Sequence, residues 1–241
     1  MNIAGTRALV TGAAGGIGRA CALMLAAHGA DTVVIVDRDA AGLERVAADV
    51  RLAGATAVVE VVDLSQPAAV ADLLHRGPGL DIVHNNAGVM SGPPDFPDTH
   101  LANMIAAISI NLAAPIVATR VMVELMRRRG RGGLILNTAS TAAFGALPPD
   151  PVYSATKAAL VNFTQACKPL AERFGIRVMA ICTGITDTNI VQRDAEWLKP
   201  ALGALKIFTP EYVASVIAEI IADDSKAGEY VALHNEPAGA S

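Results

Sequence analysis

The sequence has few aromatic residues and few cysteines. Aromatic side chains make up 4% of its 241 residues, whereas apolar residues make up 52%. Small and branched apolar side chains in this proportion are typical of a parallel sheet that is buried on both faces. The three cysteines, Cys21, Cys167 and Cys182, are odd in number and are never spaced as C-x-x-C. We therefore expect neither a disulfide framework nor a zinc site.

Excess charge and long apolar runs are also lacking. The net charge is −4, and the main basic cluster consists of Arg127, Arg128, Arg129 and Arg131. This cluster ends a predicted helix, where cations favour the helix dipole. With so little basic charge we expect no nucleic-acid partner and no binding to a membrane surface. We also expect no membrane span, because no apolar run is long enough to cross a bilayer. Because no signal peptide is visible at the N-terminus, the expected location is the cytoplasm.

A glycine-rich stretch lies near the start of the chain. Residues 6–10 predict a short buried strand, and T-G-A-A-G-G-I-G follows from Thr11 to Gly18, before a helix predicted to about Ala27. In this context the glycines let the backbone approach a pyrophosphate, and the helix N-terminus supplies N–H donors. The alternative is a tight turn that only packs the helix against the sheet.

An acidic residue ends the next predicted strand, residues 32–36. Asp37 lies nineteen residues after Gly18, a spacing that suits an acid binding the adenosine ribose. Its carboxylate would accept hydrogen bonds from the ribose hydroxyls and repel a 2′-phosphate, which favours NAD over NADP. Arg38 complicates this interpretation, since an arginine at this point can bind that phosphate. Alternatively, Asp37 caps the helix predicted over residues 39–53.

The stretch Y-S-A-T-K places Tyr153 and Lys157 on one face of a predicted helix. An ammonium beside a phenol favours the phenolate, and a shift of about two to three units from a pKa of about 10 would suit catalysis near neutral pH. Ser140 follows a predicted strand and could hold a substrate oxygen. Alternatively, Tyr153 and Lys157 are only a pair of neighbouring side chains on the protein surface.

Ser154 and Lys157 also match S-x-x-K of serine β-lactamases, whose companion motifs S-D-N and K-T-G are absent.

A long helix is predicted over residues 100–129, and Asn111 and Pro115 lie inside it. Asparagine is a poor residue for a helix interior. The ring of Pro115 clashes with the carbonyl of Asn111, and proline has no N–H to donate to it. We expect a local break in the helix, where the freed carbonyl could hold a water.

The alternation of seven predicted strands with helices indicates an α/β fold, a doubly wound Rossmann-type parallel sheet. No linker is visible, so residues 1–241 are predicted to form a single domain. The long irregular segment 184–208 contains the only tryptophan, Trp197, and is typical of a lid over a substrate. A second continuous helix is expected from Tyr153 to Phe174, and the tail from Asn235 onward is expected to be loose.

Taken together, these motifs resemble the short-chain dehydrogenase/reductase family over essentially the whole chain. The resemblance rests on T-G-A-A-G-G-I-G at Thr11, Asp37, Asp63, N-N-A-G at Asn85, Asn111, Ser140 and Y-S-A-T-K at Tyr153. Shorter phrases, such as P-V-Y-S-A-T-K at Pro151 and A-I-C-T-G at Ala180, are similar to NAD-dependent hydroxyprostaglandin dehydrogenases.

The resemblance implies hydride exchange between NAD and a secondary alcohol or ketone, with Tyr153 as the general acid/base. Lys157 would lower the pKa of Tyr153 and hold the nicotinamide ribose, Ser140 would orient the substrate oxygen, and Asn111 would carry a water. The implied cofactor contacts are Gly12, Gly16, Ile17, Gly18, Asp37, Arg38, Asp63, Leu64, Asn86, Tyr153, Lys157, Thr186 and Thr188. Apolar residues in the segment 184–208 favour an apolar substrate, and the family favours a homodimer or homotetramer. The alternative is an NAD-binding protein without catalysis.

Two single positions and one short run depart from the family pattern. Thr183 precedes Gly184 where most members have proline, so the turn loses a rigid φ. The run from Leu233 to Glu236 replaces a glycine-rich end, which puts the common tetramer contacts in doubt. His84 replaces an aliphatic residue, and we interpret it as a buried histidine whose hydrogen bonds are satisfied.

Overall fold

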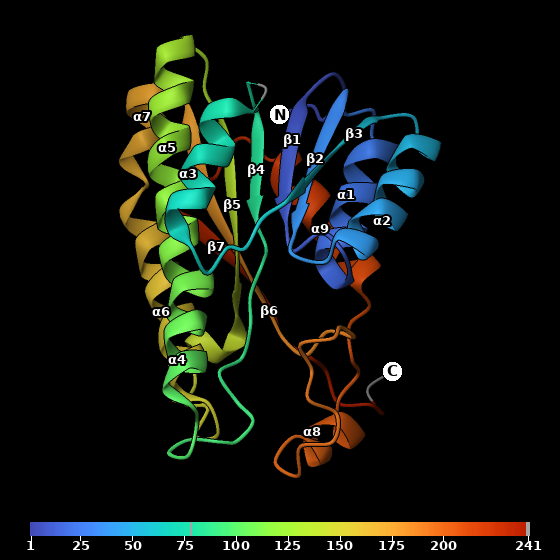
Figure 1. Ribbon diagram of the computed structural model, residues 1–241, viewed down its shortest axis with the longest axis vertical. Helices are drawn as coiled ribbons and strands as arrows, with labels where there is room; N and C mark the ends of the chain where they lie inside the picture. The colour runs from blue at the N-terminus through green and yellow to red at the C-terminus, as the bar shows by residue number, and fades with distance from the viewer. Residues whose placement is uncertain (78, 240–241) are drawn as a thin grey trace.

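Seven parallel strands form one sheet between two layers of helices (Figure 1) in a computed structural model that describes residues 1–77 and 79–239. The strand order is β3-β2-β1-β4-β5-β6-β7, which confirms the expected fold class. The strands are β1 (Arg7–Thr11), β2 (Thr32–Asp37), β3 (Thr56–Val61), β4 (Ile82–Asn85), β5 (Gly133–Ser140), β6 (Ile176–Thr183) and β7 (Glu229–Leu233).

The helices cover both faces of this sheet. One face carries α1 (Gly16–Ala27), α2 (Ala40–Leu52) and α9 (Pro210–Ala222), and the other carries α3 (Pro67–Arg76), α4 (Leu101–Ile108), α5 (Ala114–Arg129), α6 (Pro151–Ala166) and α7 (Pro169–Phe174). Side chains alternate between the faces of a strand. Accordingly, Val33 and Ile35 of β2 belong to one apolar core, and Val34 and Val36 belong to the other. This two-sided burial explains the apolar composition.

The point where the winding reverses lies between β1 and β4. β1 pairs with β2 on one side and with β4 on the other. The connections that follow β1 and β4 therefore run to opposite faces of the sheet. Ligands of doubly wound folds bind in the crevice outside the carboxyl ends of the strands at such a point. The glycine-rich loop after β1 and residues 86–90 after β4 therefore border the expected site.

Two predicted helices have interruptions. A π-helical segment, Ser109–Ala113, lies between α4 and α5, and it coincides with the break expected from Asn111 and Pro115. The second expected helix was predicted as continuous, but α6 ends at Ala166 and α7 begins at Pro169. This prediction was wrong because proline cannot donate the hydrogen bond that would continue the helix.

The expectation about membrane spans also needs correction. The continuous helical stretch Leu101–Arg129 is long and apolar enough to cross a bilayer by length and composition, with a window of mean hydropathy 1.8 that is only 28% buried. Leu101, Ile105 and Ile108 of this stretch are among the exposed large apolar residues. The statement that no apolar run is long enough is therefore wrong, and the cytoplasmic location stays a prediction.

Candidate active site

A cleft of about 530 Å³ lies at the carboxyl ends of the strands. It brings together most of the residues predicted from the sequence: Gly12, Gly16, Ile17, Asp37, Arg38, Asp63, Leu64, Asn86, Tyr153, Lys157 and Thr188. Four predicted residues lie outside its lining, namely Gly18, Asn111, Ser140 and Thr186. Residues from the β1, β2, β3, β4 and β6 ends and from α6 thus meet in one cavity.

The glycine-rich loop forms one wall of the cleft. Gly12 and Gly16 have φ angles of 66° and 51°, which favour glycine, and a Cβ on Gly12 would approach Ala87 Cα to 2.9 Å. A Cβ on Gly15 would meet no atom within 4 Å, and α1 starts after Gly15 without a side-chain cap. The first N–H groups of α1 are therefore left for an anion such as a pyrophosphate. Gly18 lies beneath the loop, where a Cβ would collide with the Gly12 carbonyl.

Asp37 is tied to this loop. Its Oδ2 accepts a hydrogen bond from the Ala14 N–H at 3.1 Å, and its Oδ1 accepts from the N–H of Arg38 and of Asp39. The cap of α2 is Asp39, whose side chain accepts from Gly42 N–H. The alternative role of Asp37 as the cap of this helix therefore does not hold. Because both carboxylate oxygens can accept further bonds, Asp37 remains able to bind a pair of ribose hydroxyls.

Asp63 lies on the same side of the cleft, followed by the buried Leu64. The carboxylate accepts hydrogen bonds from the backbone N–H and the hydroxyl of Ser65. These bonds, with a smaller contribution from the charge of Arg38, hold the pKa of Asp63 below its usual value. Asp63 is thus ionised at neutral pH, and its geometry is set by Ser65.

Asn86 both joins two strands and borders the cleft. Its Nδ2 donates to the Thr11 carbonyl at 3.0 Å, and its Oδ1 accepts from the Thr138 hydroxyl at 3.3 Å. Behind it, the two ring nitrogens of the buried His84 lie 2.8 Å from Thr138 Oγ1 and 3.2 Å from Cys21 Sγ. Burial lowers the pKa of His84 to about 3. His84 is therefore a neutral histidine with partners, as its interpretation from the sequence stated.

Tyr153 and Lys157 lie side by side on α6 and face the cleft. The Lys157 Nζ donates to the Thr138 carbonyl at 2.7 Å and lies 5.6 Å from the centroid of the Tyr153 ring. Lys157 is buried, and this burial lowers its pKa to about 8. Ser154 instead donates to the Pro151 carbonyl, so Ser154 and Lys157 are each occupied by a backbone acceptor rather than by one another.

The pKa of Tyr153 differs from the expectation. Burial raises it to about 12, hydrogen bonding with Ser140 acts in the opposite direction, and the carboxylate of Asp150 raises it further. The sequence had implied a lower value because of Lys157. Burial dominates since removing a phenolate from water is costly. The hydroxyl of Ser140 also donates to the Thr183 carbonyl at 3.3 Å.

Asn111 acts through its side chain as well as its place in the π-helical segment. The fully buried amide accepts from Val89 N–H at 2.8 Å and donates to the Val89 carbonyl at 2.8 Å. It thereby fixes the chain after β4, where a Cβ on Gly88 would lie 3.2 Å from Lys157 Nζ and 3.4 Å from Asn111 Oδ1. Asn111, which lies outside the lining of the cleft, is therefore a close neighbour of Lys157, which lines it.

Asp150 was missed by the sequence analysis. This buried carboxylate accepts from Ser91 N–H at 2.7 Å, from the Ser91 hydroxyl at 2.6 Å and from Tyr153 N–H at 2.9 Å. It caps α6 and fastens the loop after β4 to the helix that carries Tyr153. The helix-start pattern of an aspartate before Pro151 is a local signal that could have found the cap, although not its partner Ser91.

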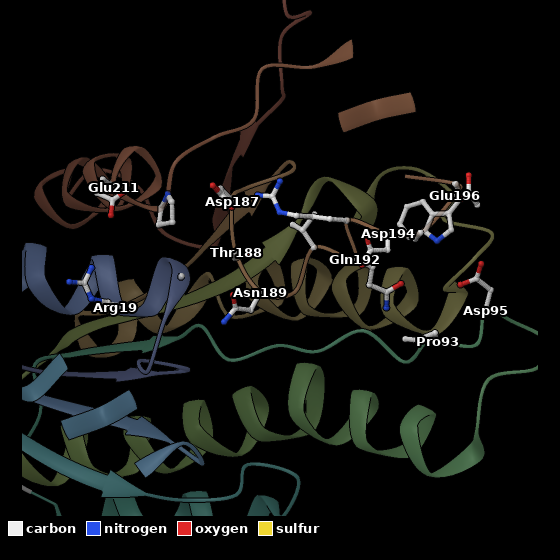
Figure 2. A pocket seen from close by; sticks show the side chains of 16 residues that line it. Arg19, Pro93, Asp95, Asp187, Thr188, Asn189, Gln192, Asp194, Glu196 and Glu211 are labelled. Atoms are coloured by element: carbon white, nitrogen blue, oxygen red, sulfur yellow. Dashed lines mark hydrogen bonds and ion pairs between the residues drawn. The ribbon is translucent and has the colours of Figure 1, made fainter. Parts of the chain in front are cut away.

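The segment 184–208 borders the cleft with Thr188, Asn189, Ile190 and Gln192, and a second cavity of about 1110 Å³ lies beside it. Figure 2 shows carboxylates and amides along this second cavity, from Arg19 and Glu211 to Asp95. Trp197 borders this second cavity, and Leu198 is buried. Short helix α8 (Lys199–Ala204) interrupts the segment. The expected apolar lid is thus apolar toward the cleft only at Ile190.

Across residues 1–77 and 79–239, His, Cys, Asp and Glu side chains form no cluster that could hold a metal ion. The donor set of the cleft instead fits a dinucleotide. The loop after β1 offers N–H groups to a pyrophosphate, Asp37 offers acceptors to a ribose, and Lys157 offers a donor to a second ribose.

Comparisons with known proteins agree with this geometry. A profile described as short chain dehydrogenase matches residues 6–199. "Probable oxidoreductase EphD" of Mycobacterium tuberculosis is 33% identical over 230 residues, which cover 88% of this chain and 38% of that protein. The chain therefore spans well under half the length of this relative. "1-deoxy-11-beta-hydroxypentalenate dehydrogenase" of Streptomyces exfoliatus is 34% identical over 198 residues, covering 80% of this chain and 71% of that protein.

A solved structure has the same fold. The crystal structure of a short chain dehydrogenase from Burkholderia cenocepacia in complex with NADP superposes with a TM-score of 0.86 at 30% sequence identity. The match covers 97% of this chain and 98% of that chain. A profile match of this length, with relatives above 30% identity, shows that the chain belongs to the short-chain dehydrogenase/reductase family of nicotinamide-dependent oxidoreductases.

Proposed function

We propose that this protein is an NAD-dependent oxidoreductase that interconverts a secondary alcohol and its ketone, with Tyr153 as the general acid/base. One observation carries the proposal. Tyr153 and Lys157 line the same cleft as the glycine-rich loop and Asp37. A proton-transfer group and a dinucleotide cradle are both needed for this reaction, and here one cavity holds both.

In this mechanism the residues of the chain handle the proton and the positioning. The nicotinamide, when bound, would accept or supply the hydride and, in its oxidised form, would bring a positive charge to the cleft. Tyr153 would donate its proton to a ketone oxygen or take one from an alcohol. Lys157, held by the Thr138 carbonyl, would direct its remaining N–H groups toward a ribose. Ser140 would hold the substrate oxygen beside Tyr153.

The raised pKa of Tyr153 affects the two directions differently. A phenol with a pKa of about 12 is neutral at pH 7, which is the form that ketone reduction needs. Alcohol oxidation needs the phenolate, and a nearby cation would favour that form. Oxidation should therefore accelerate as the pH rises, whereas reduction should change little near neutrality.

The preference for NAD rests on Asp37. Its carboxylate borders the cleft and is held by three backbone N–H groups, so it cannot easily turn away from a bound ribose. A 2′-phosphate would face this negative charge. Arg38, which also lines the cleft, is the residue that would offset the repulsion if NADP were used.

An apolar substrate is supported by the walls near Tyr153. Val89, Met90, Ile110 and Ile190 line the cleft, and these apolar side chains come from three separate segments. The relative from Streptomyces exfoliatus is named as a dehydrogenase of a hydroxy compound, 1-deoxy-11-beta-hydroxypentalenate, which agrees with an alcohol as the substrate. From these apolar walls we assign an apolar secondary alcohol as the substrate, with the segment 184–208 as the lid.

The exposed apolar face of α4 supports a homodimer or homotetramer. Leu101, Ile105 and Ile108 are 70%, 55% and 46% exposed, and α4 lies beside α6. Burying such a face against a second copy would remove apolar surface from water. Sedimentation analysis at micromolar concentration tests this assignment, and a monomer would contradict it.

A binding protein without catalysis is the second candidate function, because the cradle alone would bind NAD. The neighbouring Tyr153, Lys157, Asn111 and Ser140 argue for catalysis. An S-x-x-K acyl-transfer enzyme has no support, since Ser154 and Lys157 are held by separate backbone carbonyls.

Titration with NADH and, separately, NADPH tests the proposal. Trp197 borders the second cavity and belongs to the segment 184–208, which also borders the cleft, so its fluorescence should change if this segment moves on binding. A thermal shift provides an independent readout. We expect NADH to bind at least about tenfold more tightly, a difference of about 1.4 kcal/mol. Tighter NADPH binding would make Arg38 the deciding residue. If NADH binds but no apolar secondary alcohol is oxidised, the binding-protein alternative gains support, and if neither cofactor binds, both are wrong.

A further inference from the structure

The tail after β7 is bonded to the lid, residues 184–208, rather than loose as the sequence analysis expected. Lys206 N–H donates to the Glu236 carbonyl at 2.8 Å, and Ala238 N–H donates to the Ala204 carbonyl at 2.9 Å. Leu205 and Pro237 form an antiparallel bridge between these bonds. The red segment that follows β7 accordingly runs close to α8 in Figure 1. Residues 234–239 therefore form a strap along residues 204–208, the part of the lid where the chain returns toward the sheet, which we call the returning arm.

Asn235 connects this strap to both arms of the lid. Its Oδ1 accepts from Ile185 N–H at 2.6 Å, and its Nδ2 donates to the Ile185 carbonyl at 2.9 Å and the Lys206 carbonyl at 3.0 Å. Gly184 leaves the space for this amide, because a Cβ there would collide with Asn235 Oδ1. The side chain of Asn235 thus bonds both to residues 185–187, where the chain leaves β6 and which we call the outgoing arm, and to the returning arm at Lys206.

The two arms are joined to each other at the same level. Asp187 N–H donates to the Phe208 carbonyl at 2.8 Å, and Phe208 N–H donates to the Ile185 carbonyl at 3.1 Å. We call these paired residues, Ile185, Asp187 and Phe208, the base of the lid. The cleft-lining residues Thr188, Asn189 and Ile190 follow directly after it. The position of these three residues over the cleft therefore depends on how firmly the base is held.

The other end of the cleft-lining stretch, at Gln192, makes a separate hydrogen bond to the rest of the protein. Gln192 Nε2 donates to the Gly92 carbonyl at 2.8 Å, which links the lid to the loop after β4. Figure 2 shows Gln192 pointing toward Pro93 in that loop. A single bond of this kind is weak, whereas the base has three bonds from Asn235 and two between the arms. The lid would therefore open from the Gln192 end and remain fixed at the Asn235 end.

We propose that Asn235 is a positioning residue that clamps the base of the lid and so holds residues 188–190 over the cofactor cleft. It acts through Ile185 and Lys206, and it is not among the residues that line the cleft. Its kinetic consequence rests on the proposed function, since it assumes that a nicotinamide cofactor occupies the cleft. The clamp itself is independent of that assumption. Trp197, as the only tryptophan and a member of the lid, reports on it directly.

The test uses Asn235→Ala and Asn235→Asp in the full-length protein. Alanine removes all three bonds, and aspartate keeps the acceptor for Ile185 N–H but turns a carboxylate toward two carbonyls. His234→Ala is the matched control, because His234 is the exposed neighbour and makes none of these bonds. Acrylamide quenching of Trp197 and limited proteolysis of residues 187–197 are measured without cofactor, and KM and kcat are measured with NADH.

We expect both Asn235 variants to increase the acrylamide quenching constant of Trp197 roughly twofold, with faster cleavage in the lid, because the local opening free energy falls. KM for NADH should rise about five- to tenfold while kcat changes by less than about threefold, since the lid contributes to binding more than to chemistry. The His234→Ala control should match the wild type in all four measurements.

Two results would overturn the proposal. One is unchanged quenching and proteolysis in both Asn235 variants, and the other is a mobile lid with an unchanged KM for NADH. If Asn235→Ala lost its cooperative thermal transition, Asn235→Asp would decide between these outcomes. If the wild type bound no NADH, the proposed function would fail, whereas the quenching and proteolysis results would still support or contradict the clamp.

Discussion

The two sides of the cleft are held by different kinds of contact. On the nucleotide side, the glycine-rich loop, Asp37 and Asn86 lie at the ends of β1, β2 and β4, which are neighbours in the sheet. On the lid side, Gln192 reaches Gly92 across 100 residues, and Asn235 reaches Ile185 across 50 residues. The first side is positioned by the ladder of the sheet, and the second by isolated hydrogen bonds between distant segments.

This difference teaches where rigidity and adaptability lie. A parallel sheet buried on both faces cannot shift one strand end without disturbing its whole ladder, so the nucleotide side is preorganised. We expect the lid side to open more easily, because only a few hydrogen bonds hold it, and loops of this kind carry specificity. Substitutions on the nucleotide side should therefore alter one defined contact, whereas substitutions on the lid side should alter mobility.

The largest effect is expected at the junction of the two sides, from Tyr153→Phe. Loss of the phenol hydroxyl removes the proton-transfer group, so kcat should fall about 10³-fold, while the Kd for NADH changes less than about twofold. Turnover and NADH titration are measured on the same preparation. Tyr212→Phe is the control, because Tyr212 is 47% exposed and its ring stacks on Phe208 without reaching the cleft. Turnover of Tyr153→Phe within tenfold of the wild type would contradict the assignment.

A smaller effect is expected from Asp37→Asn on the nucleotide side. Asparagine keeps an oxygen acceptor but loses the negative charge that would repel a 2′-phosphate. The affinity for NADPH should rise about tenfold, and the affinity for NADH should change less. Asp39→Asn is the matched control, since it makes the same change of charge two residues away and asparagine is also a good helix cap. An equal gain in NADPH affinity from both variants would show that Asp37 has no specific role.

Sequence patterns predict the nucleotide side because its causes are local. Gly12 and Gly16 need positive φ, Asp37 ends a strand, and Pro115 forces the break at Asn111. Strand alternation then predicts the seven-stranded sheet. Each of these inferences uses residues within one element or one turn.

The remaining features depend on contacts that no local pattern contains. Asp150 meets Ser91 across 59 residues, and the partner of Asn235 is likewise far away in the chain. The pKa of Tyr153 was predicted in the wrong direction because Lys157 is visible in the sequence, whereas the depth of burial is not. The helix break before Pro169 was a local signal that was available and was overlooked.

The smallest change in chemistry, and the last prediction, is Asp150→Asn. The substituted side chain would turn an amide N–H toward the donors from which the carboxylate now accepts, so the free energy of unfolding should fall by about 2 kcal/mol, or about 4–8 °C in Tm. Asp194→Asn, in the exposed part of the lid, controls for the lost charge. A thermal melt measures the stability effect, and no loss of stability would contradict the bonding role of Asp150.

The pH profile separates this bonding role from an electrostatic role. The Asp150 carboxylate raises the pKa of Tyr153, so its removal should lower that pKa and favour the phenolate. In the proposed mechanism alcohol oxidation requires the phenolate and should speed up as the pH rises, so in Asp150→Asn this rise should begin at a lower pH than in the wild type. A loss of stability alone would reduce the fraction of folded, active protein, but it would not shift the pH dependence of alcohol oxidation. A shift to lower pH in Asp150→Asn, absent in Asp194→Asn, would therefore show that the Asp150 carboxylate adds to the effect of burial in raising the pKa of Tyr153.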